Sequence, residues 1–255
     1  MKIVSIAIQK GGSGKTTTAI NLAAALQQMG HTVLLVDLDP QANLTQSMGF
    51  LDERETSIYA LLKQVAFGQS VDLDPVIVAA NGLDLVPSAL DLADAELELV
   101  SIYGREKLLR QLLKPVRERY DFIFIDCPPS VGMLTVNALA ASDYVLLPLQ
   151  AEFLPLKGVS SFMRLFSMIK KQVNKKLTVL GILLTKYDRR KVMNRHVLDQ
   201  LTKDFGPLVF ETKIRTNIAL ASAQQKGVDI FSYDRSANGA YDYLRLAQEF
   251  LSKIE

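Results

Sequence analysis

Five apolar runs along the chain have the length and composition of buried β-strands. Each run is hydrophobic at nearly every position rather than at alternate positions, as strands are when helices cover both faces of a parallel sheet. These runs cover residues 3–8, 32–37, 120–126, 143–148 and 178–185. A weaker run at 82–87 predicts one more short strand.

Segments with helical spacing separate the apolar runs. In residues 15–29, Ala19, Leu22 and Leu26 recur at helical spacing, and Gly30 is a suitable stop. Further helices are predicted at 57–63, 104–113, 157–172, 192–203 and 239–253. Strands that alternate with helices in this way predict an α/β fold, a mostly parallel twisted sheet flanked by helices.

The composition agrees with one cytoplasmic domain. The 255 residues are 49% hydrophobic, and we find no linker or repeat, so residues 1–255 are predicted to form a single domain. The single cysteine, Cys127, excludes a disulfide framework and an iron–sulfur site held by several cysteines of one chain. No apolar run approaches ~18 residues, and the run after Lys2 is too short for a signal peptide. We therefore expect no stable membrane association.

The most informative stretch lies between the first predicted strand and the first predicted helix. Residues 9–17 read Gln-Lys-Gly-Gly-Ser-Gly-Lys-Thr-Thr. Glycines let successive backbone N–H groups converge on an anion, and a helix N-terminus adds the positive end of its dipole. The order predicts a phosphate-binding loop, in which Lys15 reaches the terminal phosphates and the Thr16 hydroxyl ligates Mg²⁺. A dinucleotide-binding fingerprint does not fit, because it needs a glycine where Thr17 stands.

The run Lys-Gly-Gly-Ser-Gly-Lys-Thr-Thr resembles the deviant Walker A box of the ParA/MinD ATPases, and the whole chain resembles their short, Soj-like partition branch. The resemblance implies a deviant-Walker P-loop NTPase fold with ATP and Mg²⁺ as cofactors. The loop residues that it implies for nucleotide binding are Lys10, Gly11, Gly12, Ser13, Gly14, Lys15, Thr16 and Thr17.

The resemblance also gives a role to the lysine at the entrance of the loop. In the family this lysine, here Lys10, reaches the phosphates of a partner chain across a nucleotide-sandwich dimer. The role is that of an arginine finger supplied in trans. It implies a homodimer that bound ATP holds together and that hydrolysis releases.

Three aspartates lie at the ends of predicted strands. Asp126 closes an apolar run, where a P-loop ATPase carries the acidic residue that holds Mg²⁺-bound water. Asp37 and Asp39 close another run, which the resemblance identifies as switch I. It implies that Asp39 positions the attacking water, whereas we interpret Asp37 as structural. Residues 128–137 correspond to switch II.

Together these assignments give two overlapping sets of site residues. The catalytic set is Lys10, Lys15 and Asp39. The set around Mg²⁺ is Thr16, Asp39 and Asp126.

The base-binding segment is less well defined. Residues 214–217 read Ile-Arg-Thr-Asn, and Asn217 is the candidate for the adenine contact. The usual family wording has a proline and then an arginine before this asparagine. Residues 185–188, Thr-Lys-Tyr-Asp, depart from the guanine box Asn-Lys-x-Asp at the first position. That departure favours ATP over GTP.

Positive charge is concentrated in one late segment, although the net charge of the chain is only +2. Asp188 is the only acidic residue from 164 to 195, a span with ten basic residues: Arg164, Lys170, Lys171, Lys175, Lys176, Lys186, Arg189, Arg190, Lys191 and Arg195. Such a patch predicts an anionic partner, and the resemblance implies DNA bound without sequence preference. We assign the DNA contacts to Lys186, Arg189, Arg190 and Arg195. Ala219 stands where relatives often carry a further arginine.

The leading hypothesis is therefore an ATP-driven switch. ATP would join two chains, the dimer would bind nucleoid DNA, and a ParB-like partner would stimulate slow hydrolysis, so that a plasmid or chromosome is partitioned. The same cycle could position a protein assembly instead. The phosphate loop begins at residue 9, so we expect no N-terminal helix-turn-helix domain.

Two other classes stay open. A MinD-like membrane-surface ATPase needs a basic amphipathic C-terminal helix. Residues 241–255 balance basic against acidic side chains and predict a core-packing helix instead. A small-molecule ligase of similar fold, such as dethiobiotin synthetase, is the third possibility, and Lys10 argues against it.

Overall fold

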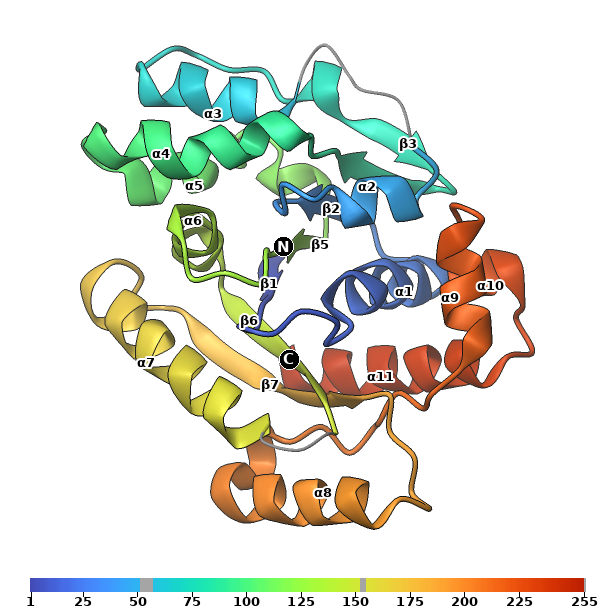
Figure 1. The fold of residues 1–255 in the computed structure, drawn as a ribbon. Helices are drawn as coiled ribbons and strands as arrows, with labels where there is room; N and C mark the ends of the chain where they lie inside the picture. The colour runs from blue at the N-terminus through green and yellow to red at the C-terminus, as the bar shows by residue number, and fades with distance from the viewer. Residues whose placement is uncertain (51–56, 152–154, 255) are drawn as a thin grey trace.

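The computed structural model describes residues 1–50, 57–151 and 155–254. In this part of the chain, one seven-stranded sheet forms the centre of the molecule (Figure 1), in the spatial order β3-β4-β2-β5-β1-β6-β7. The strands are β1 (Lys2–Ile6), β2 (Val33–Asp37), β3 (Val78–Ala80), β4 (Leu83–Val86), β5 (Phe122–Asp126), β6 (Tyr144–Gln150) and β7 (Thr178–Thr185). Every pairing is parallel except that of the edge strand β3 with β4. The predicted fold class is confirmed.

Helices cover both faces of the sheet. One face carries α1 (Lys15–Gln28), α2 (Asn43–Ser47), α9 (Ile218–Gln225), α10 (Ile230–Tyr233) and α11 (Asn238–Ile254). The other carries α3 (Ile58–Ala66), α4 (Ala95–Glu98), α5 (Leu108–Leu112), α6 (Met133–Ala141), α7 (Pro155–Gln172) and α8 (Val192–Phe205). Short 3-10 turns are η1 (Asp74–Val76), η2 (Leu90–Asp94), η3 (Leu99–Ser101), η4 (Arg105–Lys107), η5 (Arg117–Arg119) and η6 (Gly206–Leu208).

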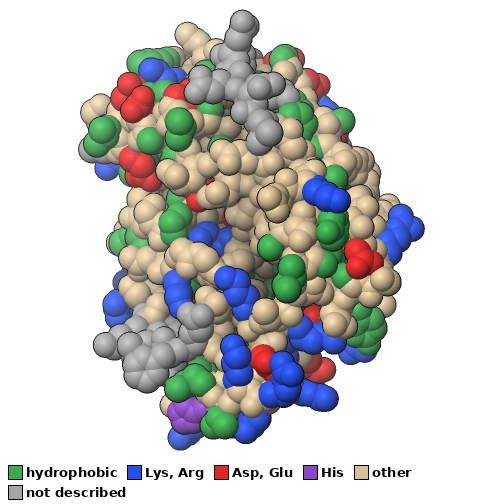
Figure 2. Space-filling model, turned by 45° about the vertical axis from the view of Figure 1, so that its right-hand side comes forward, with side chains coloured by type: hydrophobic (Ala, Val, Ile, Leu, Met, Phe, Trp, Pro, Cys, Tyr) green, Lys and Arg blue, Asp and Glu red, His purple; other side chains and the backbone are tan. Residues whose placement is uncertain are grey.

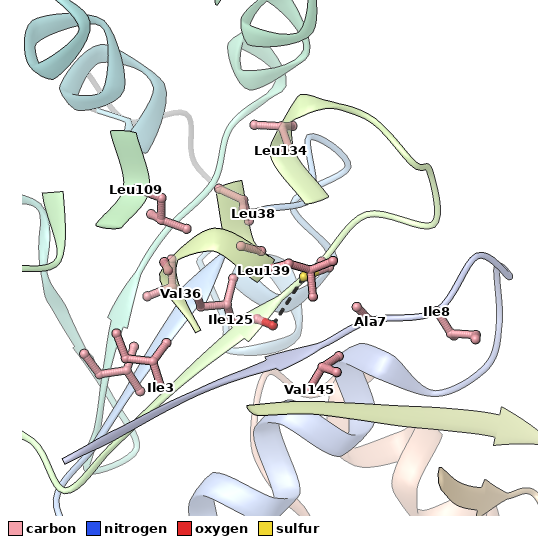
Figure 3. Packing of buried hydrophobic residues seen from close by; sticks show 14 of the residues in the cluster. Ile3, Ala7, Ile8, Val36, Leu38, Leu109, Ile125, Leu134, Leu139 and Val145 are labelled. Atoms are coloured by element: carbon pink, nitrogen blue, oxygen red, sulfur yellow. Dashed lines mark hydrogen bonds between the residues drawn. The ribbon is translucent and has the colours of Figure 1, made fainter. Parts of the chain in front are cut away.

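The sheet separates two hydrophobic cores. Side chains alternate between the faces of a strand, so in β5 Ile123 and Ile125 enter one core while Phe122 and Phe124 enter the other. Figure 3 shows the first core, where Ile125 lies among aliphatic side chains of β2 and α6. Burial of both faces explains why the strands are apolar at nearly every position.

The strand register places the functional segments side by side. Ile6 at the end of β1 and Asp37 at the end of β2 both pair with Asp126 at the end of β5. The loop after β1 and the carboxylates of β2 and β5 therefore meet at one edge, the carboxyl edge where ligands bind in open α/β sheets.

Most predicted elements are present, and the differences have physical reasons. The predicted helix at 104–113 is a 3-10 turn, η4, followed by the short α5. Helix α6 escaped prediction because most of its residues are buried, so it has no polar face that would reveal a period. Helix α2 spans only one turn and carries little periodicity. No helix among the described residues is long and apolar enough to cross a membrane.

Candidate nucleotide-binding site

The loop between β1 and α1 has the backbone shape that a phosphate-binding loop requires. Gly12 and Gly14 have φ angles of 69° and 89°, in the left-handed region that glycine adopts most readily. Gly14 also precedes the first residue of α1, so the loop ends at a helix N-terminus. The Thr185 hydroxyl of β7 donates a hydrogen bond to the Ser13 carbonyl oxygen at 2.7 Å and fixes the loop against the sheet.

Lys15 and Thr16 begin α1 and point toward the ends of the strands. The Lys15 side chain is buried, and its Nζ donates to the Lys10 carbonyl oxygen at 3.3 Å. The Thr16 hydroxyl donates to Asp126 Oδ2 at 2.6 Å, which joins the loop to the end of β5. Thr16 and Asp126, which the sequence analysis places at Mg²⁺ from two distant segments, are therefore in contact.

The other oxygen of Asp126 fits a metal site. Asp126 is 1% exposed, and its Oδ1 has no hydrogen-bond partner among the described residues. Such a buried acceptor is costly unless an ion or water satisfies it. A carboxylate beside a threonine hydroxyl is an oxygen donor set of the kind that Mg²⁺ takes together with phosphate oxygens and waters.

The charge state of the carboxylates depends on this burial. Loss of solvation raises the pKa of Asp126 well above its usual value, and the nearby charge of Asp37 raises it further, while the Thr16 hydrogen bond and the Lys15 charge lower it. Burial also raises the pKa of Asp37 to about 6, against the lowering effect of its hydrogen bonds from Thr45. A cation beside Asp126 would favour its ionised form.

Asp37 and Asp39 have different surroundings although they close the same strand. Asp37 is fully buried and accepts hydrogen bonds from the Thr45 backbone N–H at 2.8 Å and from the Thr45 hydroxyl at 2.7 Å. It holds α2 against β2, which agrees with a structural role. Asp39 lines the cavity described below, and its Oδ1 accepts the Gln41 N–H at 3.0 Å.

A cavity of about 780 Å³ lies over this edge of the sheet. This volume is typical of small-molecule and cofactor sites. Its phosphate side is formed by residues 11–17, Asp39 and Pro129, and its far side by residues 214–217 and by α9. The cavity thus brings together the predicted loop residues Gly11, Gly12, Ser13, Gly14, Lys15, Thr16 and Thr17 with Asp39 and Asn217. Asp126 lies behind Thr16 rather than in the lining.

Asn217 immediately precedes α9 and caps its N-terminus. Its Oδ1 accepts the backbone N–H of Ala219 at 2.8 Å, which fixes the orientation of the amide at the edge of the cavity. Its neighbour Arg215 is held by Asp242, with Nη2 and Oδ1 separated by 2.7 Å. The departure from the family wording at Arg215 therefore corresponds to an ion pair with α11.

Several lining residues were missed in the sequence. Asn43, Gln46 and Ser47 enter from α2, and Gln224 enters from α9. Gln224 accepts the Thr17 hydroxyl at 3.1 Å and donates to the Ser47 hydroxyl at 3.4 Å, so it connects three segments that are distant in sequence. The only local signal was the switch I sequence at residues 39–43, Asp-Pro-Gln-Ala-Asn, because α2 is too short to show a hydrophobic period.

Lys10 has a different position from Lys15. It is half-buried at the entrance of the loop and is not among the described residues that line the cavity.

The predicted DNA-contacting residues do not all lie together. Lys186 lines the nucleotide cavity, where its φ of 48° is unusual for a residue other than glycine. Arg189, Arg190 and Arg195 are exposed at the start of α8, away from the cavity lining. Arg190 pairs with Asp188 at 2.9 Å, and Arg195 Nη1 donates to the Arg189 carbonyl oxygen at 2.8 Å. In the view of Figure 2, Lys and Arg side chains gather on the lower part of the molecule.

Known proteins resemble this chain over nearly its whole length. A family model described as an AAA domain matches residues 1–179. The sporulation initiation inhibitor protein Soj of Bacillus subtilis is 41% identical over 249 residues, which cover 97% of each chain. The chromosome partitioning protein ParA of Caulobacter vibrioides is 38% identical over 257 residues, covering 99% of this chain and 95% of that protein.

A solved structure is similar in fold and was determined with bound ligands. The crystal structure called cobyrinic acid a,c-diamide synthase from Mycobacterium smegmatis, with bound ADP and magnesium, has a TM-score of 0.84 and 36% identity. It covers 98% of this chain and 94% of its own. The cavity and the oxygen donors of Thr16 and Asp126 fit a nucleotide and Mg²⁺. The chain belongs to the ParA/MinD family of P-loop ATPases, among the Soj- and ParA-type proteins.

Proposed function

We propose that this protein is an ATP-dependent dimerising switch that binds DNA without sequence preference and hydrolyses ATP to partition a plasmid or chromosome. The observation that carries the proposal is the contrast between the two lysines of the phosphate loop. Lys15 is buried in the cavity of its own chain, whereas Lys10 belongs to the same loop but lies outside that lining. This arrangement supports a Lys10 that contacts the nucleotide of a partner chain.

Each residue of the site has a distinct part in the proposed reaction. Lys15 and the N–H groups of residues 11–16 would bind the phosphates, and Asn217 would contact the base. Thr16 would ligate Mg²⁺, and Asp126 would hold its waters. Bound Mg²⁺ supplies positive charge to the phosphate oxygens. Asp39, at the cavity wall, would orient the attacking water.

The basic residues at the start of α8 support the DNA part of the proposal. Arg189, Lys191 and Arg195 are exposed, and only Arg190 is described in an ion pair with the local acid Asp188. Exposed arginines and lysines bind phosphates by releasing counterions, which requires no base contacts. A ParB-like partner would stimulate hydrolysis, as the likeness to ParA and Soj suggests.

The membrane-surface alternative has less support. The apolar face of α11 is packed in the core, with Tyr243, Leu246 and Phe250 buried. An amphipathic helix that binds a membrane needs such a face exposed.

The name of the mycobacterial neighbour gives a second candidate, a synthase for a small molecule. The two functions differ in what stimulates ATP hydrolysis. DNA and a partner protein would stimulate a partition ATPase. A dependence on a small carboxylic acid, with none on DNA, would favour the synthase.

The Asp39→Ala variant tests the proposed switch. The variant should bind ATP but hydrolyse it too slowly to release the dimer, so gel filtration with ATP should give a dimer and without nucleotide a monomer. A variant that stays monomeric with ATP at every concentration, or that still hydrolyses ATP as the wild type does, would refute the proposal.

A further inference from the structure

The loop at residues 127–131 joins β5 to α6 and borders the nucleotide cavity. At its start, the Cys127 N–H donates to the Ile6 carbonyl oxygen at 3.2 Å, next to the fixed carboxylate of Asp126. Pro129 then lines the cavity, and Pro129, Ser130 and Val131 are exposed. The position of this loop over the cavity therefore depends on how firmly its second end, the start of α6, is held.

Glu96 holds that second end from another part of the chain. It lies on α4, and its Oε2 accepts the backbone N–H of Met133 at 2.6 Å while its Oε1 accepts that of Leu134 at 3.2 Å. Met133 and Leu134 are the first two residues of α6, whose N–H groups have no partner inside the helix. A carboxylate at this place also interacts favourably with the helix dipole.

The residue before the helix is matched to this contact. A Cβ atom built on Gly132 would overlap the Glu96 carboxylate. Any side chain at Gly132 would therefore displace Glu96 from the helix. One turn further along α6, Asn137 donates to the Arg105 carbonyl oxygen at 2.7 Å and accepts the Leu109 N–H at 3.1 Å. Helix α6 is thus fixed to the segment 96–109 at two successive turns.

We propose that Glu96 is a positioning residue for the loop at residues 127–131, acting through the N-terminus of α6. Its carboxylate sets how often the loop lies in the position where Pro129 lines the cavity. Loss of the carboxylate leaves α1 and its phosphate-binding loop unchanged. The effect on hydrolysis rests on the proposed function, whereas the effect on the loop does not.

A fluorescent probe tests the effect on the loop directly. The chain has no tryptophan, and Val131 is 43% exposed, so Val131→Trp places one indole in the loop. In this background Glu96→Ala and Gly132→Ala should both increase acrylamide quenching, because a lost helix-terminal charge contact raises the mobile population about fivefold. Glu96→Gln keeps one acceptor oxygen, so its acrylamide quenching should be intermediate between that of the parent and that of the two alanine variants.

Glu98→Ala is the matched control, because Glu98 lies on the same helix but pairs with Lys63 at 2.9 Å on the surface. Equal quenching in the parent, Glu96→Ala and Gly132→Ala would overturn the proposal, as would an equal increase in Glu98→Ala. Circular dichroism checks that each variant folds. If Glu96→Ala does not fold, Glu96→Gln and Gly132→Ala decide the test by the same criterion.

Kinetics without the probe test the consequence for the site. Glu96→Ala should lower the rate of ATP hydrolysis about fivefold and leave the Kd for ATP within about twofold, because the phosphate-binding loop is intact. An equal loss of ATP affinity and of hydrolysis rate would contradict a positioning role. A wild-type protein that hydrolyses no ATP would refute the proposed function, yet the quenching result would still decide the role of Glu96.

Discussion

The phosphate side of the cavity and the basic surface at the start of α8 are built in opposite ways. On the phosphate side, Asp37 and Asp126 are buried at the ends of parallel strands and Lys15 is buried at the start of α1. Hydrogen bonds within the chain fix the positions of all three. The basic surface is formed by Arg189, Arg190, Lys191 and Arg195, which are exposed at and just before the start of α8. The first region can recognise a ligand by geometry, whereas the second can recognise one mainly by charge.

This difference predicts how each region responds to substitution and to solution conditions. Changes on the phosphate side should depend on which atom is removed, and salt should influence them little, because buried interactions are weakly screened. Changes on the basic surface should depend on net charge and strongly on salt.

The largest effect is expected for Lys15→Ala. The variant loses the buried ammonium that would bind the terminal phosphates, and a charged hydrogen bond of this kind corresponds to about a hundredfold in affinity. Calorimetry should give a Kd for ATP raised by this factor. Lys171→Ala, at an exposed position on α7, is the control. Unchanged affinity in Lys15→Ala would remove the phosphate-loop assignment.

A smaller effect is expected when three arginines of the basic surface are reversed. Arg189→Glu, Arg190→Glu and Arg195→Glu together should reduce DNA affinity at least about tenfold and lower the slope of log K against log salt by about 2 to 3. ATP affinity should not change. Anisotropy of a labelled DNA duplex at several salt concentrations measures both quantities.

The control for this triple variant carries the same change of charge elsewhere. Lys107, Arg110 and Lys114 are exposed in and near α5, which lies far from α8 in Figure 1 although both helices cover the same face of the sheet. Their replacement by glutamate should leave the salt slope near that of the wild type. If both triple variants lose DNA affinity equally, net charge alone is responsible and the surface at α8 is not the binding site.

The smallest effect concerns the titration of Asp37. Its pKa is raised to about 6 by burial, so the folded state binds the proton more tightly than the unfolded state does. The resulting stability is present at low pH and is lost as pH rises through about 6. Between pH 5 and 7 this loss is about 1 kcal/mol in the free energy of unfolding.

Denaturant unfolding without nucleotide, followed at several pH values, tests this expectation. The wild type should lose more stability between pH 5 and 7 than Asp37→Asn, which cannot titrate there. Identical pH dependence in the two proteins would show that Asp37 is ionised throughout this range. The basic surface contributes no such dependence, because arginine stays charged.

The two regions also differ in how far the sequence predicts them. The phosphate side could be predicted because buried strands and a glycine loop leave a strong local pattern, and the ends of neighbouring parallel strands must meet. The Thr16–Asp126 contact follows from that topology. The roles of Gln224 and Glu96 could not be predicted, because each residue contacts a segment that is distant in the sequence. Neither the face of α9 that carries Gln224 nor the short α4 that carries Glu96 leaves a local pattern.

For the basic surface, only the excess of positive residues in one segment could be predicted. The sequence gives the number of positive residues but not their neighbours, and the structure places Lys186 at the nucleotide cavity rather than with the arginines of α8. Arg190 is partly neutralised by Asp188 two residues before it. Local pairing of this kind depends on rotamers that a charge pattern does not specify.

Exchange of Lys10 between two chains is the central claim, and a mixing experiment tests it most directly. Lys10→Ala and Asp39→Ala should each be inactive alone. In a mixed dimer, the Lys10→Ala chain keeps its own Asp39 and receives Lys10 from its partner, so one of the two sites is complete. Equal amounts of the two variants, mixed as monomers, should pair at random when ATP is added. Half of the dimers are then mixed and each has one complete site, so a single-turnover phosphate burst should come from about a quarter of the bound ATP. A mixture that releases no more phosphate than the separate variants would contradict the claim.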